Sequence, residues 1–205
     1  MVRASARDLE MLRFVGEQYT VTLPQLARLM GRSEHAARCL RSRWARAGWA
    51  QGRALLVGEP VFIWLTRRGL RAAGLEYRAW RPNPGALAHI AAVNEVRLYF
   101  AGRRPEALWV CERELAREAK RELGGFGAHR ADGLLVSDDF EVAIEVELTQ
   151  KRRARAELVM REQMARYGSV VYFAAPGPRR MLERLAAELG GGRVEVHPLP
   201  GKAEP

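Results

Sequence analysis

Cysteine, lysine and long apolar runs are all scarce in this sequence. Cys39 and Cys111 are the only two cysteines among 205 residues, and their wide separation predicts free thiols in a reducing compartment. No pair of Cys and His residues has zinc-finger spacing. No apolar stretch approaches the ~20 residues of a membrane-spanning helix, and the charged start MVRASARDLEML is unlike a signal peptide. We therefore expect a cytoplasmic protein that has no membrane partner.

Basic charge, in contrast, is present in excess. The formal net charge is +10 and the pI about 10.5, and only three of the 34 basic residues are lysines. A coding bias toward arginine would explain the preference for arginine over lysine, but it does not explain an excess of ten over the acids. Because phosphate contacts dominate the affinity of proteins for nucleic acids, this balance favours a nucleic-acid partner.

The first 75 residues have the pattern of a winged helix-turn-helix domain. Apolar residues recur there at helical spacing, with Thr22, Ser33 and Thr66 as helix starts and Gly31 and Gly48 as helix ends. The expected elements are helices over residues 6–19, 24–30, 33–47 and 67–73, and strands over residues 49–57 and 61–65. Three helices followed by a β-hairpin and a further helix make up the winged-helix arrangement.

The third expected helix carries the candidate DNA contacts. Ala37, Leu40 and Trp44 recur every three or four residues and should face the core, which leaves an arginine-rich side exposed. Arginine on a recognition helix reads guanine bidentately. The alternative is a surface helix that its arginines keep in solution. The residues that we expect to contact duplex DNA are Arg32, His35, Arg38, Arg41, Ser42, Arg43 and Arg46, with Arg53 in the wing and Arg155 further along the chain.

The rest of the chain is expected to form a second domain. Residues 76–85, EYRAWRPNPG, contain two prolines and a glycine and are typical of a linker. Residues 86–197 follow the order α-β-β-β-α-β-α-β, which predicts a central mixed sheet with helices on both faces. The loop at residues 124–127 is interpreted as a flexible flap, and residues 198–205 as a flexible tail.

Residues 129–151, HRADGLLVSDDFEVAIEVELTQK, hold the candidate chemistry. Two strands are expected there, over residues 131–136 and 140–148, and the second places Glu145 and Glu147 on the face opposite its apolar residues. Neighbouring strands lie ~5 Å apart, so Asp132 and Glu145 are expected to share one Mg²⁺ or Mn²⁺ ion. Such an ion polarises a phosphodiester and lowers the pKa of a bound water.

Several neighbours complete this candidate site. Lys151 is expected to orient the water or to neutralise charge on the phosphate, so that Asp132, Glu145, Glu147 and Lys151 form the catalytic set. Glu112 is a further candidate metal ligand, although a surface glutamate at a strand end is the ordinary interpretation. His129 is a weaker candidate base. The alternative for the whole stretch is a solvated strand edge.

These residues resemble a known nuclease pattern. Asp132, Glu145-x-Glu147 and Lys151 resemble a variant of the PD-(D/E)xK pattern of restriction-endonuclease-like nucleases. More narrowly, residues 6–175 resemble the replication-relaxation family of plasmid and mobile-element proteins. The features that carry this resemblance are a winged-helix start, His89-x-x-x-Val93-Asn94, the run WVCEREL at residues 109–115, Asp132-Gly133, and IEVEL at residues 144–148 followed by Lys151. His89 and Asn94 are interpreted as a hydrogen bond in helix packing.

The resemblance implies both a fold and a role. It implies an α+β chain in which a winged-helix domain precedes an α/β restriction-endonuclease-like domain, acting on DNA in plasmid replication, mobilisation or its control. The sequence departs from the nuclease pattern at Ala131, where proline is usual, and at Glu147, where the catalytic lysine usually stands. Lys151 is expected to substitute from the following helix.

If Lys151 cannot take that place, the site binds metal without cleaving or is only a scaffold. Three functions therefore stay open: a DNA-binding regulator, a metal-dependent endonuclease, and an adaptor for replication or transfer proteins. A homodimer stays open as well, because nothing in the sequence decides the oligomeric state.

Overall fold

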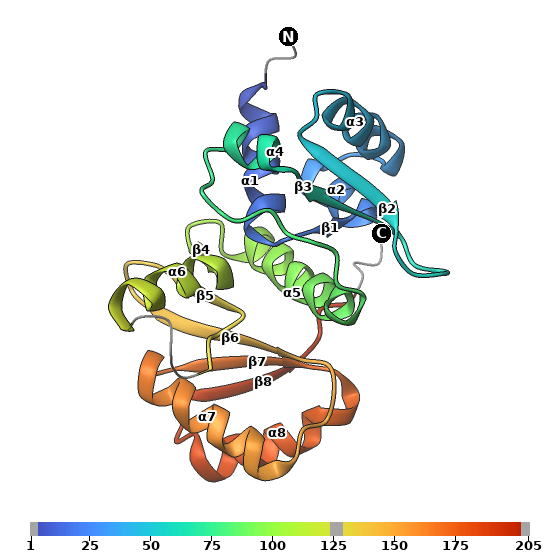
Figure 1. Cartoon of the computed structure of the whole chain (residues 1–205). Helices are drawn as coiled ribbons and strands as arrows, with labels where there is room; N and C mark the ends of the chain where they lie inside the picture. Colours follow the sequence, from blue (N-terminus) through green and yellow to red (C-terminus); the bar gives the residue numbers. More distant parts are fainter. Residues whose placement is uncertain (1–3, 124–128, 202–205) are drawn as a thin grey trace. The chain divides into compact units, whose positions relative to one another are not determined.

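The computed structural model describes residues 4–123 and 129–201, and the chain divides into two compact units between Asn94 and Glu95 (Figure 1). The division falls inside helix α5 (Pro84–Arg103), so the first unit includes the expected linker and the first part of that helix. The expected flap at residues 124–127 and the end of the expected tail, residues 202–205, lie outside the described residues. No helix in the described ranges combines the length and the apolar character needed to cross a bilayer.

The first unit has the winged helix-turn-helix arrangement. Its elements before α5 are α1 (Ala6–Glu17), β1 (Val21–Thr22), α2 (Leu23–Met30), α3 (Glu34–Arg46), β2 (Ala50–Ala54), β3 (Val61–Leu65) and α4 (Arg67–Ala72). Strand β3 lies between β1 and β2 and is antiparallel to both. Strand β1 was not expected, because two residues are too short to show an alternation.

Local capping determines where the helices of this unit begin. At each of the four helices a hydroxyl side chain accepts a hydrogen bond from a backbone N–H of the first turn, which satisfies a donor that has no partner within the helix. The capping residues are Ser5, Thr22, Ser33 and Thr66. Gly31 ends α2 in the left-handed region, with φ 59°, where glycine is unstrained. The helix starts predicted at Thr22, Ser33 and Thr66 are therefore confirmed.

The start of α5 is joined to the winged helix by buried amide groups. Asn94 is fully buried, and its Nδ2 donates to the Thr20 carbonyl at 2.8 Å and to Gln25 Oε1 at 3.1 Å. Gln25 Nε2 in turn donates to the Ala91 carbonyl at 2.8 Å. The packing role expected for Asn94 is thus confirmed, and these bonds explain why the first unit extends as far as Asn94.

The second unit is a mixed α/β structure. After the last part of α5, its elements are β4 (Leu108–Cys111), α6 (Glu112–Leu123), β5 (Gly133–Val136), β6 (Glu141–Glu147), α7 (Arg153–Tyr167), β7 (Val170–Ala174), α8 (Pro176–Leu189) and β8 (Val194–Pro198). The sheet order is β4-β5-β6-β7-β8. The first three strands are antiparallel, and β6, β7 and β8 are parallel. The predicted mixed sheet and α+β class are confirmed.

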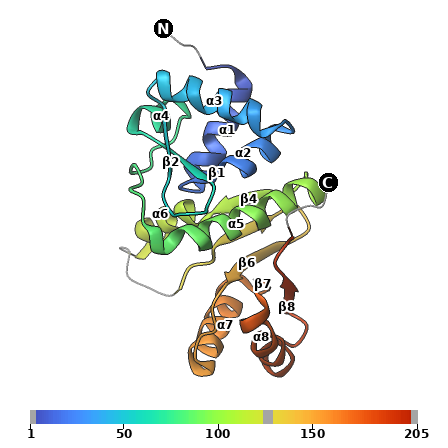
Figure 2. The same cartoon turned by 90° about the vertical axis from the view of Figure 1, so that its right-hand side faces the viewer.

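Helices cover both faces of this sheet. Helices α7 and α8 lie side by side on one face (Figure 2). Met160 and Leu182 of these helices pack in a core with Ala143 and Tyr172. On the other face the rings of Tyr99 and Phe100, from the last part of α5, lie 5.9 Å and 5.6 Å from the Phe173 ring. Side chains in the middle of β6 are therefore enclosed whichever face they point to, as the buried Ala143, Ile144 and Glu145 show.

Candidate functional site

Helix α3 has one buried and one exposed side. Ala37, Leu40 and Trp44 face the core, as their spacing predicts. The exposed candidates are His35, Arg38, Ser42, Arg43 and Arg46 on α3, Arg32 in the turn before it, and Arg53 on β2. Arg41 differs from these residues, because it is only partly exposed and lies beside β2. A Cβ built on Gly52 would approach Arg41 Cδ to 3.1 Å, so Arg41 braces the helix against the wing.

Two of these arginines already have acidic partners. Arg38 Nη2 lies 3.2 Å from Glu34 Oε2, and both side chains are exposed. An exposed pair of this kind is weak, so Arg38 can exchange its partner at little cost. Arg43 instead bonds to Asp8, whose side chain is only 3% exposed. Arg43 therefore joins α3 to α1, a role that its place in an arginine-rich run did not indicate.

Asp8 is the centre of this junction, and sequence reasoning missed it. Its oxygens accept from Ser5 N at 3.0 Å, from Ser5 Oγ at 2.7 Å, from Trp44 Nε1 at 2.9 Å and from Arg43. Burial by itself raises the pKa of Asp8, but the bonds from Trp44 and Ser5 and the charge of Arg43 outweigh it and hold the pKa below its ordinary value. The sequence signal was the capping box at residues 5–8.

In the second unit, Asp132 and Glu145 lie on neighbouring strands as predicted. Asp132 N donates to the Ile144 carbonyl at 3.0 Å, and Val146 N donates to Asp132 Oδ2 at 2.8 Å. The Asp132 carboxylate is thus fixed against the backbone of β6. Gly133 is required next to it, because a Cβ there would lie 2.2 Å from the Trp109 ring.

Glu145 is enclosed, which rules out for this residue the alternative of a solvated strand edge. The residue is 4% exposed. Its Oε2 lies 3.1 Å from His129 Nε2, and its Oε1 accepts from Gln163 Nε2 of α7 at 2.7 Å. Alternation predicts which residues share a face of a strand, but it does not predict whether a helix covers that face. Here α7 covers it.

Glu145 and His129 are electrostatically linked. Burial raises the pKa of Glu145 to about 7; the bond from His129 opposes this rise, and the charge of Asp132 adds to it. The pKa of His129 is also raised, chiefly by its bond to Glu145, while burial acts in the opposite sense. The pair therefore takes up protons near neutral pH. A perturbed carboxylate of this kind is typical of functional sites.

Lys151 does not project from a helix, which corrects the expected geometry. Helix α7 begins at Arg153, and Arg152 has an extended backbone, with φ −61° and ψ 138°. Lys151 thus lies in the turn after β6, where its ammonium group pairs with Glu147 Oε2. Arg155 is exposed on α7 and does not share a helical face with Lys151, since only Arg155 is helical. Glu147 therefore balances the charge of Lys151. Glu147 is the residue that stands where the PD-(D/E)xK pattern usually has its catalytic lysine.

Two buried polar atoms beside Glu145 have no hydrogen-bond partner among the described residues. They are Gln163 Oε1 and the Tyr172 hydroxyl. Tyr172 is the register partner of Glu145 on β7, and burial raises the pKa of its hydroxyl. The orientation of the Gln163 amide is determined, because Nε2 donates both to Glu145 and to the His129 carbonyl at 3.3 Å.

The oxygen atoms of Asp132, Glu145 and Gln163 are of the chemical type that binds Mg²⁺ or Mn²⁺. Carboxylates and an amide oxygen without a hydrogen-bond partner are hard ligands. Within residues 4–123 and 129–201, however, no three His, Cys, Asp or Glu side chains gather closely enough to hold a metal ion. Glu112 begins α6 directly after Cys111, the register partner of Gly133, and so lies at the same end of the sheet as Asp132.

The fold and these sites define a winged-helix chain with a second, mixed α/β unit. No family model matches it, and no curated protein does. Among solved structures it is similar to one titled "Multiple Antibiotic Resistance Repressor, MarR", with 12% identity over 58% of this chain and 67% of that chain, and a TM-score of 0.31. At this TM-score the likeness implies nothing about the function of this chain.

The Asp8 junction should control the stability of the first unit. In Asp8→Asn the bonds from Ser5 and Trp44 lose their charged acceptor and Arg43 loses its counter-ion, which should cost about 1–3 kcal/mol of unfolding free energy. Because the folded pKa of Asp8 is lowered, the stabilisation is present above the ordinary value of 3.8 and is lost as pH falls through the folded pKa. Denaturant unfolding followed by tryptophan fluorescence measures both effects.

Glu10→Gln is the matched control for Asp8→Asn, because Glu10 is an exposed acid on the same helix. Its unfolding midpoint should stay close to that of the wild type. Equal midpoints for Asp8→Asn and Glu10→Gln would show that the junction contributes no stability.

Glu145 should make the second unit less stable as pH rises through neutrality. Its folded pKa of about 7 lies above the ordinary 4.5, so between these values the folded unit keeps a proton that the unfolded chain has lost, and stability falls with rising pH. Glu145→Gln removes this dependence. At pH 8 its β6 and β7 amides should exchange about tenfold more slowly than those of the wild type, with a much smaller difference at pH 5.

Hydrogen exchange with mass spectrometry is suitable because it reports on β6 and β7 without requiring two-state unfolding of the whole chain. Glu141→Gln, an exposed glutamate on the same strand, is the control and should behave as the wild type does at both pH values. If the Glu145→Gln difference is the same at pH 5 and pH 8, the proton uptake is not located at Glu145.

Proposed function

We propose that this chain binds duplex DNA by placing α3 in the major groove. The observation that carries this proposal is the exposed row of His35, Arg38, Ser42 and Arg46, which repeats at three- or four-residue spacing opposite the buried Leu40. Side chains in such a row reach base edges and phosphates from one side of a recognition helix. The net charge of +10 favours the same kind of partner.

The wing supports this docking. Arg53 is exposed on β2, whereas residues 62–65 of the paired strand β3 are buried, so β3 anchors the strand pair in the core. The hairpin thus holds Arg53 ready for a phosphate or the minor groove. Arg41, packed against Gly52, fixes α3 relative to this hairpin. A docking surface built on such rigid elements loses little conformational entropy when it binds.

We further propose that DNA binding serves the replication or mobilisation of a plasmid or mobile element, or its control. The support is the order of sequence motifs that resembles the replication-relaxation family. The order of helices and strands in the second unit supports a restriction-endonuclease-like fold for it, and replication or transfer proteins are then its candidate partners.

A second candidate function is a metal-dependent endonuclease, and one observation favours it. Glu145 is a buried carboxylate with a raised pKa, and the unpartnered Gln163 Oε1 lies on the residue that binds it. Asp132 and Glu145 would hold a Mg²⁺ or Mn²⁺ ion, which when bound polarises a phosphodiester. We rank this function second, because Glu147 neutralises Lys151 and Val146 N donates to Asp132 Oδ2.

Arg38→Ala tests the DNA interface. The loss of one basic contact should weaken binding to duplex DNA and reduce the slope of log affinity against log salt by about one for each lost phosphate contact. Fluorescence anisotropy on random-sequence duplexes over a range of salt measures both. Arg71→Ala, which removes an exposed arginine of α4, is the charge-matched control and should leave the slope unchanged. Equal slopes for the two variants would exclude α3 from the interface.

Cleavage of supercoiled plasmid with Mg²⁺ or Mn²⁺ separates the two functions. A DNA-binding regulator should leave the plasmid intact while it retards duplex DNA in a gel. Cutting by the wild type and by Glu141→Gln, but not by Asp132→Ala, would instead establish the endonuclease. If the chain neither cuts nor retards DNA and captures a replication or transfer protein, it acts as an adaptor.

A further inference from the structure

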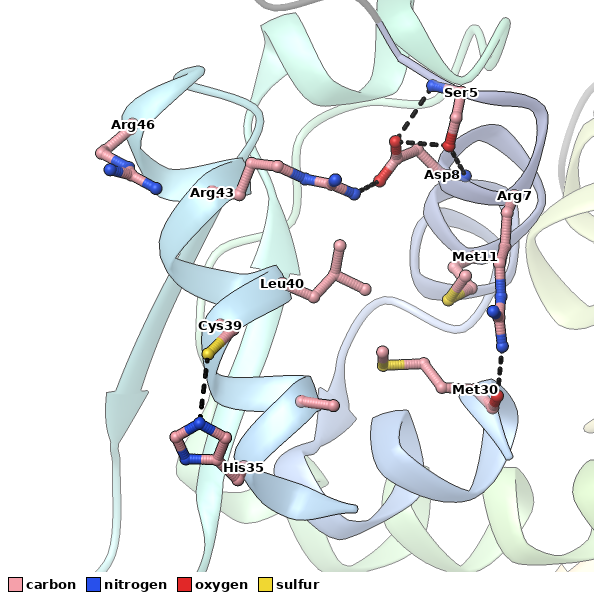
Figure 3. A pocket seen from close by; sticks show the side chains of 11 residues that line it. Ser5, Arg7, Asp8, Met11, Met30, His35, Cys39, Leu40, Arg43 and Arg46 are labelled. Carbon is pink, nitrogen blue, oxygen red and sulfur yellow. Dashed lines mark hydrogen bonds and ion pairs between the residues drawn. The ribbon is translucent and has the colours of Figure 1, made fainter. Parts of the chain in front are cut away.

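A pocket of about 710 Å³ opens in the first unit between α1, the end of α2 and α3 (Figure 3). This volume is within the range of about 300–1,000 Å³ that small-molecule sites occupy. Its lining combines apolar side chains with arginines. The residues that decide its chemistry are Met11, Met30, Leu40, Arg7, Arg43 and Arg46.

The charge of the pocket is positive. Its lining contains three arginines but one carboxylate, that of Asp8, whose oxygens already accept from Ser5, Trp44 and Arg43. Arg7 donates to the Met30 carbonyl, which carries no net charge, as Figure 3 shows, and it makes no ion pair with another described residue. Arg46 makes no ion pair within the described part of the chain. An anion is the occupant that complements this excess of positive charge, since hydrogen bonds between arginine and an anion are stronger than those between neutral groups.

The floor of the pocket is apolar. Met11 and Leu40 are buried at 4% and 7% exposure, and Met30 lies beside them. Methionine side chains are flexible and polarisable, and they adapt to apolar groups of different shape. An inorganic anion would leave this floor uncovered, whereas an anion with an apolar body would cover it and gain free energy in proportion to the buried area.

We propose that this pocket binds a small organic anion, an aromatic or medium-chain carboxylate, and that its occupancy weakens DNA binding by α3. The second part rests on the proposed function. His35 and Arg46 line the pocket and also belong to the exposed row of α3. A carboxylate paired with Arg46 removes that arginine from DNA, so the ligand and DNA compete for the same guanidinium group.

Cys39 provides a direct test of occupancy. It lines the pocket and is exposed, while Cys111 is buried, so N-ethylmaleimide should modify Cys39 selectively. We expect 2-naphthoate to slow this modification saturably. The neutral 2-naphthamide, which has nearly the same shape, should need an at least about tenfold higher concentration, the equivalent of losing one favourable charge contact. Equal protection by both compounds, or by neither, would overturn the anion site.

Variants locate the bound anion. In calorimetric titrations with 2-naphthoate, Arg46→Ala should weaken binding about tenfold, while Arg71→Ala should not. Ala36→Trp fills the pocket and should abolish binding, whereas Ala45→Trp, exposed on the same helix outside the lining, should not. If Ala36→Trp does not fold, the exposed Arg46 still decides the question. Unchanged affinity in Arg46→Ala would place the ligand elsewhere and refute the proposal.

The effect on DNA is measured separately. Saturating 2-naphthoate should lower the DNA affinity of the wild type about tenfold and have a clearly smaller effect on Arg46→Ala. Binding of 2-naphthoate with unchanged DNA affinity would overturn the coupling alone. If the wild type binds no DNA at all, the proposed function and the coupling fail together, and protection of Cys39 still decides whether the anion site exists.

Discussion

The buried carboxylate of Asp8 holds the winged helix of this chain together. One side chain caps α1 through Ser5, accepts the indole N–H of Trp44 from the core of α3, and pairs with Arg43 on the surface of α3. A carboxylate taken out of water is costly unless donors and a cation surround it, and Asp8 has both. The orientation of α3, and with it the direction of its exposed arginines, depends on this junction.

Glu145 is enclosed as well, and fewer partners oppose the desolvation that raises its pKa. Asp8 is surrounded by a cation and several hydrogen-bond donors, which keep it ionised, whereas Glu145 has Gln163, His129 and a nearby second acid. The pKa of one is therefore lowered and that of the other raised to about 7. An enclosed carboxylate is thus a structural anchor in the first unit, at Asp8, and a proton-binding group in the second unit, at Glu145.

Helix α3 contributes to two surfaces, the exposed row of polar and basic side chains and the lining of the pocket. Arg38 and Ser42 lie on the outer row, and Arg46 belongs both to that row and to the lining of the pocket. The proposed competition between a small anion and DNA needs no movement of the backbone, because both would bind the guanidinium group of Arg46. The neighbouring Arg43 does not take part in the same way, since Asp8 holds it.

Much of the fold was predictable because its signals are local. Hydroxyl caps, glycine stops and helical spacing located the helices of the first unit to within a few residues, and alternation located β6. The pairing of Asp132 with Glu145 across neighbouring strands was also predictable, because a tight turn leaves few registers open. Strand β1 was not predictable, because its two residues are too few to show an alternation. The start of α7 was not predictable either, because no capping residue next to Lys151 marks a helix boundary.

The sequence by itself determined most of the helices and strands, the arginine-rich side of α3 and the acidic composition of β6, because each depends on residues close together in the chain. Only the tertiary structure decided that Arg43 belongs to Asp8, that Gln163 and His129 enclose Glu145, and that Lys151 neutralises Glu147. The first two pair residues at least sixteen positions apart, and the third depends on the path of the turn after β6. Burial and partner choice follow from packing between elements, which local patterns do not encode.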